Sequence, residues 1–173
     1  MKAFFIVRII EMKKGFITKY HVIQSLLAGI FITIIILVGE TFSNNVINAA
    51  IGSSVALLFL HPKNRQNRFK SLVVGNLIAI ITFILLHFLF QLFDQDLYVS
   101  ISNKNFHIFS GISFFICLLV MTLTNSEHVP AAGTSIGLSV HEFDFRLILF
   151  VIFSVLFLYV FKLALDRYGK NII

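Results

Sequence analysis

Two stretches rich in Gly, Ala and Ser decide the fold: residues 46–60, VINAAIGSSVALLFL, and residues 128–140, HVPAAGTSIGLSV. As helices they would be about 20–23 Å long, because an α-helix rises about 1.5 Å per residue. The hydrocarbon core of a bilayer is thicker, about 30 Å. Small side chains let helix backbones approach closely, so both stretches are expected at the centre of the molecule and away from lipid. Each is expected either as a short helix or as an extended piece followed by a half-helix.

Longer apolar runs flank the two short stretches. They cover residues 20–38, 71–93, 106–122 and 145–165. Each is close to the roughly 20 residues that a membrane-spanning helix needs. Of the 173 residues, 58% are hydrophobic and 13% are charged, against about 45–50% and about 25% in a soluble domain. The sequence therefore predicts an all-α fold, a polytopic membrane helix bundle with four long transmembrane helices and two short segments.

Positive charge predicts the orientation. If both short stretches cross the membrane, every Lys and Arg except Lys104 and Arg146 lies on one side. The positive-inside rule then places both termini in the cytoplasm and the protein in the plasma (inner) membrane. Two other topologies stay open. If neither short stretch crosses, the basic cluster at 63–70 faces outward; if only the first crosses, the C-terminus lies outside.

The net charge of +6 has a second consequence for partners. The basic residues are spread over three segments that flank membrane spans. Orientation and contact with anionic lipid explain them more simply than nucleic-acid binding does. We therefore expect the lipid bilayer as a partner and no nucleic acid.

Three segments divide the chain. Residues 1–19 are predicted to be a cytoplasmic, interfacial amphipathic segment, because Arg8 interrupts the apolar run and no signal-peptide cleavage site follows. Residues 20–165 are predicted to form a single transmembrane domain. Residues 166–173 are the predicted cytoplasmic tail.

The transmembrane domain divides into halves, residues 20–93 and 106–165, each with the pattern long–short–long. Each half makes an odd number of passes, so the second begins on the opposite side of the membrane from the first. This pattern predicts a 3+3 inverted repeat, in which short small-residue segments at matching positions indicate a transport site. The alternative is a six-helix bundle whose small residues only pack.

The second short stretch supplies one wall of a candidate site for a small anion. Pro130 suits the first turn of a helix, because its missing N–H is not needed there. The free amides after it, including that of Ala131, would face the membrane interior, where the positive end of a helix favours an anion. The candidate residues are His128, Pro130, Ala132, Gly133, Thr134 and Ser135. Alternatively, the GxxxG spacing of Gly133 and Gly137 only packs helices.

The first short stretch supplies the other wall, and the loop after it a gate or funnel. The wall residues are Gly52, Ser53 and Ser54, and the gate or funnel residues are His61, Arg65 and Arg68. Histidine is a residue type that suits a pH-sensitive gate, although a histidine at a helix end is often an interfacial or capping residue. The two arginines would attract anions, or they serve only as determinants of topology.

No cofactor or metal is predicted, and no enzyme. Residues 133–137, GTSIG, match GxSxG, but a nucleophile elbow requires a strand–turn–helix context that a membrane segment does not provide. The pairs at residues 127–128 and 141–142 combine Glu with His. Neither has the HExxH spacing, and the predicted topology places them on opposite sides of the membrane.

A resemblance to a known family rests on residues 128–134, HVPAAGT, together with residues 52–59, GSSVALLF, Pro62 and the Gly75-Asn76 pair. The first segment is similar to the His-Pro-Pro-Ala-Gly-Ala-Thr signature of the HPP family of integral membrane proteins, with Val129 in place of the central proline. The likeness covers roughly residues 20–165. That family is usually described with four transmembrane segments, and its plastid and cyanobacterial members are associated with nitrite transport. The resemblance therefore implies an anion substrate.

These features together predict a small membrane transporter or channel for a small inorganic anion, nitrite-like by the resemblance. The first rival is a non-transporting membrane scaffold or accessory subunit. The second is an intramembrane serine hydrolase using Ser135 with His87 or His128. Because so short a chain offers few helices to enclose a pathway, a homodimer is also expected.

Overall fold

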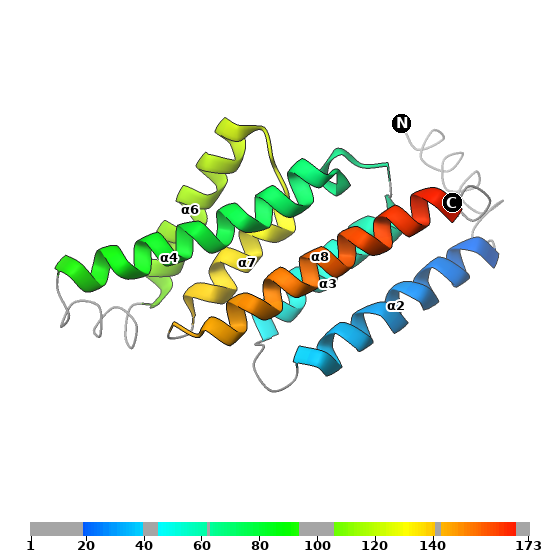
Figure 1. Ribbon diagram of the computed structural model, residues 1–173, viewed down its shortest axis with the longest axis horizontal. Coiled ribbons are helices and arrows are strands. Elements are labelled where there is room, and N and C mark those ends of the chain that lie inside the picture. The colour runs from blue at the N-terminus through cyan, green and yellow to red at the C-terminus, as the bar shows by residue number, and fades with distance from the viewer. Residues whose placement is uncertain (1–18, 40–44, 62, 94–105, 141–142, 169–173) are drawn as a thin grey trace, which may run out of the picture.

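The computed structural model describes residues 19–39, 45–61, 63–93, 106–140 and 143–168 (Figure 1). Helices make up almost all of this part of the chain, and it contains no strand. The helices are α2 (Lys19–Gly39), α3 (Asn45–Leu60), α4 (Gly75–Phe93), α6 (Phe106–Thr124), α7 (Val129–Ser139) and α8 (Phe145–Tyr168). A 3₁₀ turn (Arg65–Asn67) and a π-helical turn (Lys70–Val74) precede α4. The prediction of an all-α fold is confirmed.

Three helical spans are long and apolar enough to cross a membrane: Val22–Gly39, Lys70–Leu92 and Phe145–Ala164. They coincide with three of the four predicted long runs, so the chain is an integral membrane protein. The fourth run corresponds to α6, whose apolar part, Ile108–Thr124, is shorter than the other three. The predicted count of four long transmembrane helices is therefore not confirmed.

Both short stretches form helices and pack against each other. The predicted segment 46–60 is the unbroken helix α3, and the predicted segment 128–140 contains the shorter α7. Each is flanked by longer helices: α2 packs on α3, α4 and α6 pack on α7, and α8 packs on α3 and α4 (Figure 1). The small residues of α7 are therefore mostly buried near the centre of the bundle, as their composition predicts, whereas Ala49, Ser53 and Ala56 of α3 are exposed.

Glycine permits this close approach of α3 and α7. A Cβ atom on Gly137 would lie 2.5 Å from the Ile47 side chain and 3.1 Å from its backbone nitrogen. A Cβ on Gly133 would lie 3.4 Å from that of Ala50. The backbone of α7 thus rests directly on α3, in the way that small residues pack membrane helices.

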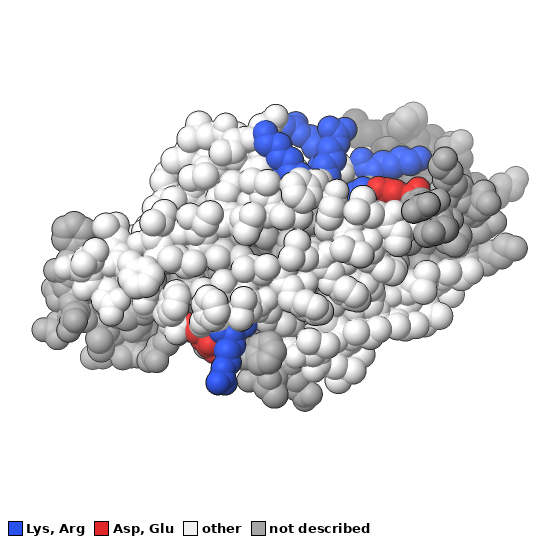
Figure 2. Space-filling model, viewed as in Figure 1, with Lys and Arg blue, Asp and Glu red and all other residues white. Residues whose placement is uncertain are grey.

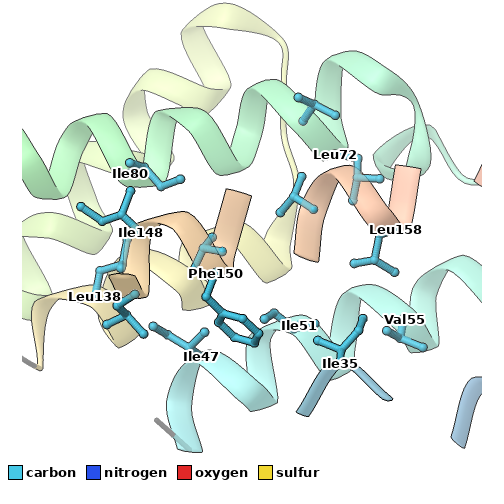
Figure 3. Close-up of a cluster of buried hydrophobic side chains, with 14 of the residues drawn as sticks. Ile35, Ile47, Ile51, Val55, Leu72, Ile80, Leu138, Ile148, Phe150 and Leu158 are labelled. Carbon is cyan, nitrogen blue, oxygen red and sulfur yellow. The ribbon is translucent and has the colours of Figure 1, made fainter. Parts of the chain in front are cut away.

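Branched and aromatic side chains join the helices around this contact. Figure 3 shows Ile35 of α2 and Leu158 of α8 on either side of the α3 residues Ile51 and Val55. The same buried cluster reaches Leu138 of α7. One continuous apolar core therefore joins the four longer helices to the two short ones.

On the face shown in Figure 2, the described charged residues gather near the two ends of helix α8, and uncharged surface lies between these groups. One end, here called the basic end, carries the loop after α3 and the last turns of α8. Its described basic side chains are Lys63, Arg65, Arg68, Lys70 and Lys162. Asp144 and Arg146 lie at the opposite end, where α8 begins (Figure 1). The predicted interfacial segment up to residue 18, the tail from residue 169, and Lys104 lie outside the described residues.

Candidate functional site

The site begins where α6 turns into α7. Asn125 has a φ of 55°, a left-handed conformation that asparagine tolerates at a helix end. The amide of Ser126 donates to the Met121 carbonyl at 3.0 Å, which closes the last turn of α6. His128 is then extended, and Pro130 lies in the first turn of α7 as the sequence predicts. The second short stretch is therefore an extended piece followed by a short helix.

His128 is fully buried at this junction, and both of its ring nitrogens have partners. Nδ1 lies 3.0 Å from the main-chain carbonyl oxygen of Gln66. A carbonyl only accepts, so Nδ1 carries the hydrogen and donates it. Nε2 lies 3.0 Å from Oγ of Ser54, whose hydroxyl donates to it in the neutral ring. His128 therefore connects α3, the loop after α3, and the start of α7.

Gln66 holds the start of α7 through its side chain as well. Its Oε1 accepts the N–H of Val129 at 3.1 Å. The amide of Ala131 donates to the His128 carbonyl at 2.9 Å. The amide of Ala131, expected to be free, is therefore engaged, and Gln66 takes up one of the donors that a helix start normally leaves without a partner.

Two residues that the sequence analysis did not select hold this junction. A Cβ atom on Gly75 would lie 2.9 Å from the Ser126 carbonyl oxygen and 3.0 Å from Cβ of His128. Asn67 is fully buried, and its Nδ2 donates to the carbonyls of Leu57 at 3.0 Å and His61 at 2.8 Å. No local sequence pattern marks Asn67, and Gly75 is marked only as part of the family pattern. Both residues contact other segments, so their roles are not visible in the sequence around them.

The remaining candidates on α7 point in different directions, because successive helical residues are about 100° apart. Thr134 faces α4, where its hydroxyl donates to Oδ1 of Asn76 at 3.3 Å. Ser135 lies beside Cys117 of α6 and donates to the Ala132 carbonyl at 2.8 Å. Ala132 is fully buried. Thr134 and Ser135 therefore face α4 and α6 rather than α3.

On α3 the candidates also separate. Ser54 reaches His128, whereas a Cβ on Gly52 would face Ile32 of α2 at 3.9 Å. Ser53 is exposed, and its hydroxyl donates to the Ala50 carbonyl at 2.8 Å. The structure thus brings together only some of the residues of the two predicted walls.

A groove of about 480 Å³ runs between α3 and α7. Most of its lining is apolar, and its polar side chains are those of Ser53 and Gln66. Pro130 and Gly133 form the α7 side. Three of the predicted site residues, Ser53, Pro130 and Gly133, therefore line one groove with Gln66 at its basic end.

The predicted gate and funnel residues lie on the loop at this end. The guanidinium of Arg65 donates to Oδ1 of Asn125 and so ties the loop to the turn before α7. His61 and Arg68 are exposed. Within the described residues the recorded ion pair joins Lys162 to Asp166, so the arginines of the loop keep their charge available to anions.

Within the described residues, side chains are not arranged as a metal site or a hydrolytic dyad would require. Across the described ranges no three His, Cys, Asp or Glu side chains gather as metal ligands. Ser135 donates within its own helix, and both ring nitrogens of His128 are engaged elsewhere. His87 lies among the rings of Phe83 and Phe143.

These features define a class: an all-helical integral membrane protein with two short helices packed at its centre and a buried histidine at their junction. The family model described as HPP, transmembrane region, matches residues 14–171. The chain therefore belongs to the HPP family, as the HVPAAGT segment predicts. No curated protein and no solved structure shows significant similarity to it.

Proposed function

We propose that this protein is a transporter or channel for a small inorganic anion, with nitrite as the first candidate from the family resemblance. The observation that carries the proposal is the groove between α3 and α7, which starts beside basic residues without a described acidic partner. Charge at that end would concentrate anions from the adjacent water.

Within the groove, Ser53 and Gly133 are proposed to line the path. The Ser53 hydroxyl, which donates to the Ala50 carbonyl here, would turn its hydrogen to the anion, and Gly133 leaves room beside the backbone of α7. The start of α7 adds a partial positive charge, which favours an anion. His128 and Ser54 are proposed to hold α3 against α7 rather than to contact the anion, since their polar atoms bond to each other. Ala132, Thr134, Ser135 and Gly52 would support the two walls from behind.

The inverted repeat, which stays a prediction, is supported by the pattern of helix neighbours. Exchanging α2, α3 and α4 for α6, α7 and α8 turns most of the main helix contacts into one another. The α2–α3 contact becomes α6–α7, and α4–α7 becomes α3–α8. The exception is the α4–α6 contact, which would become α2–α8; those two helices do not pack closely, although the rings of Phe31 and Phe157 stack 5.0 Å apart. In transporters built from inverted repeats, the substrate site lies where the repeats meet, which supports the proposal of a site between α3 and α7.

A flux assay in proteoliposomes tests the function. Purified protein is reconstituted, and uptake of nitrite, nitrate and formate is compared with that of empty vesicles. We expect anion-dependent flux, and we expect Ser53→Val to lower it about tenfold, because a hydroxyl donor in the path is lost. Ser25→Val, on the exposed surface of α2, is the matched control. Absence of flux for all three anions in the native chain would refute the proposal.

One observation favours the rival function of a scaffold or accessory subunit: the groove is lined mainly by apolar side chains. A scaffold requires no anion path, so it predicts vesicles as tight as empty ones. The same assay therefore separates the two functions.

A further inference from the structure

Gln66 is the residue through which the basic loop contacts α7. Its main-chain carbonyl accepts from Nδ1 of His128 at 3.0 Å, and its side-chain carbonyl accepts from the amide of Val129 at 3.1 Å. The first bond belongs to the backbone of the loop. The second depends only on where the Gln66 side chain points.

The backbone around Gln66 is firmly held. Oδ1 of Asn64 accepts the Gln66 amide at 2.9 Å, and the amide of Arg68 donates to the Arg65 carbonyl at 3.1 Å. Buried Asn67 donates to two carbonyls at the end of α3. The Gln66 side chain is only half-buried. Any opening at this point is therefore a change of the Gln66 side chain and not of the loop.

The Gln66 side chain also lines the groove between α3 and α7. It lines the basic end, beside Leu57 and Val129, while Ser53, Pro130 and Gly133 lie farther along. An anion that enters the groove at its basic end therefore meets the Gln66 amide before it reaches Ser53.

We propose that Gln66 is the gate of the groove. In the closed state its side-chain carbonyl holds the N–H of Val129; an entering anion displaces the carbonyl and accepts the same N–H. An anion is the stronger acceptor, because charge-assisted hydrogen bonds exceed neutral ones and the start of a helix favours negative charge. The inference rests on the proposed function and assigns to Gln66 the control of entry to the path.

Accessibility of a cysteine beyond the gate tests this without any transported substrate. The background is Cys117→Ala, and the reporter is Ser53→Cys in bilayer nanodiscs. The probes are two charged methanethiosulfonates, the anionic sulfonatoethyl and the cationic trimethylammonioethyl reagents, with labelling rates measured by mass spectrometry. We expect Gln66→Ala to raise both rates about threefold to tenfold, the factor expected for the loss of one hydrogen bond.

Two further variants make the result specific. Gln66→Asn keeps the amide but shortens its reach, so it should behave as Gln66→Ala does. Gln66→Glu places a carboxylate against the Val129 amide, so it should slow the anionic reagent relative to the cationic one. The matched control is Gln91→Glu, an exposed position near the far end of α4, which should leave both rates unchanged.

The outcomes distinguish this inference from the proposed function. Rates within twofold of each other in all Gln66 variants, or a reporter that no variant makes reactive, would overturn the gate. Nitrite flux is measured separately in chains that keep Ser53. Altered labelling without any anion flux would leave the gate standing and reject the function. Flux that is present but insensitive to Gln66, with unchanged labelling, would support the proposed function and reject the gate.

Discussion

At the scale of single residues, the hydrogen bond between Ser54 and His128 fixes the junction of the two short helices. His128 is fully buried, and its Nε2 has Ser54 as the donor. Ser54→Ala removes that donor and leaves a buried acceptor without a partner. We expect the free energy of unfolding to fall by about 1–3 kcal/mol, measured by thermal or denaturant unfolding of the purified protein in detergent.

Ser53 provides the matched control, one position earlier on the same helix. Its hydroxyl donates only within α3, to the Ala50 carbonyl, so Ser53→Ala should change stability little while it alters flux. Equal losses of stability in the two variants would contradict the role given to His128.

Gly75 is a second residue whose identity the junction requires. A Cβ atom there would meet the Ser126 carbonyl at 2.9 Å and His128 at 3.0 Å. We expect Gly75→Ala to destabilise the protein by about 1–3 kcal/mol, the usual cost of overpacking. Gly111→Ala serves as the control, because nothing lies within 4 Å of its added Cβ, and alanine is the better helix former. A Gly75→Ala protein as stable as the Gly111→Ala protein would show that the loop simply shifts.

The sequence predicted some of these residues and not others, for a physical reason. Pro130 and His128 belong to a recognisable local pattern, a proline in the first turn after an extended residue. Gln66 and Gly75 contact residues far along the chain, and such contacts leave no trace in local periodicity or composition. The sequence analysis therefore placed Ser54 opposite His128 but could not find Gln66, its other partner.

At the scale of elements, the contact between α3 and α7 depends on Gly137. A Cβ there would lie 2.5 Å from the side chain of Ile47, so α7 would have to move away from α3. We expect Gly137→Ala to lower stability by about 1–3 kcal/mol. Gly133→Ala, whose Cβ would lie 3.4 Å from that of Ala50, should cost clearly less.

A double variant isolates this contact. Ile47→Ala removes the nearest clashing atom but leaves the backbone nitrogen of residue 47 at 3.1 Å. The combined Gly137→Ala, Ile47→Ala protein should therefore lose less stability than the sum of the single losses, as directly coupled sites do. Strict additivity would indicate that α7 does not rest on α3 at this point.

Composition alone placed α3 and α7 at the centre, because small residues pack backbones together and large ones face lipid. It could not predict how α7 is rotated about its axis. That rotation turns Pro130 and Gly133 toward the groove, Thr134 toward Asn76 of α4 and Ser135 toward α6. Partners on three other helices set this rotation. The candidate residues that the sequence analysis grouped into one site therefore lie on separate faces of α7.

At the scale of the whole molecule, the separation of charge makes the orientation testable. Glu127 and Asp144 are exposed and lie beyond opposite ends of α7. The basic loop is tied to the turn that contains Glu127, because Arg65 bonds to Asn125. The positive-inside rule therefore places Glu127 on the cytoplasmic side and Asp144 on the outer side.

Single cysteines at these two positions decide among the three topologies left open by the sequence. In the Cys117→Ala background, Glu127→Cys and Asp144→Cys are exposed to a membrane-impermeant maleimide in intact cells. We expect Asp144→Cys alone to react, and both to react after lysis. If neither short helix crosses, both positions face outward; if only α3 crosses, both face inward. Labelling of both or of neither in intact cells would thus reject the six-pass orientation. It would also remove the reason for placing the basic end of the groove, and Gln66 with it, on the cytoplasmic side.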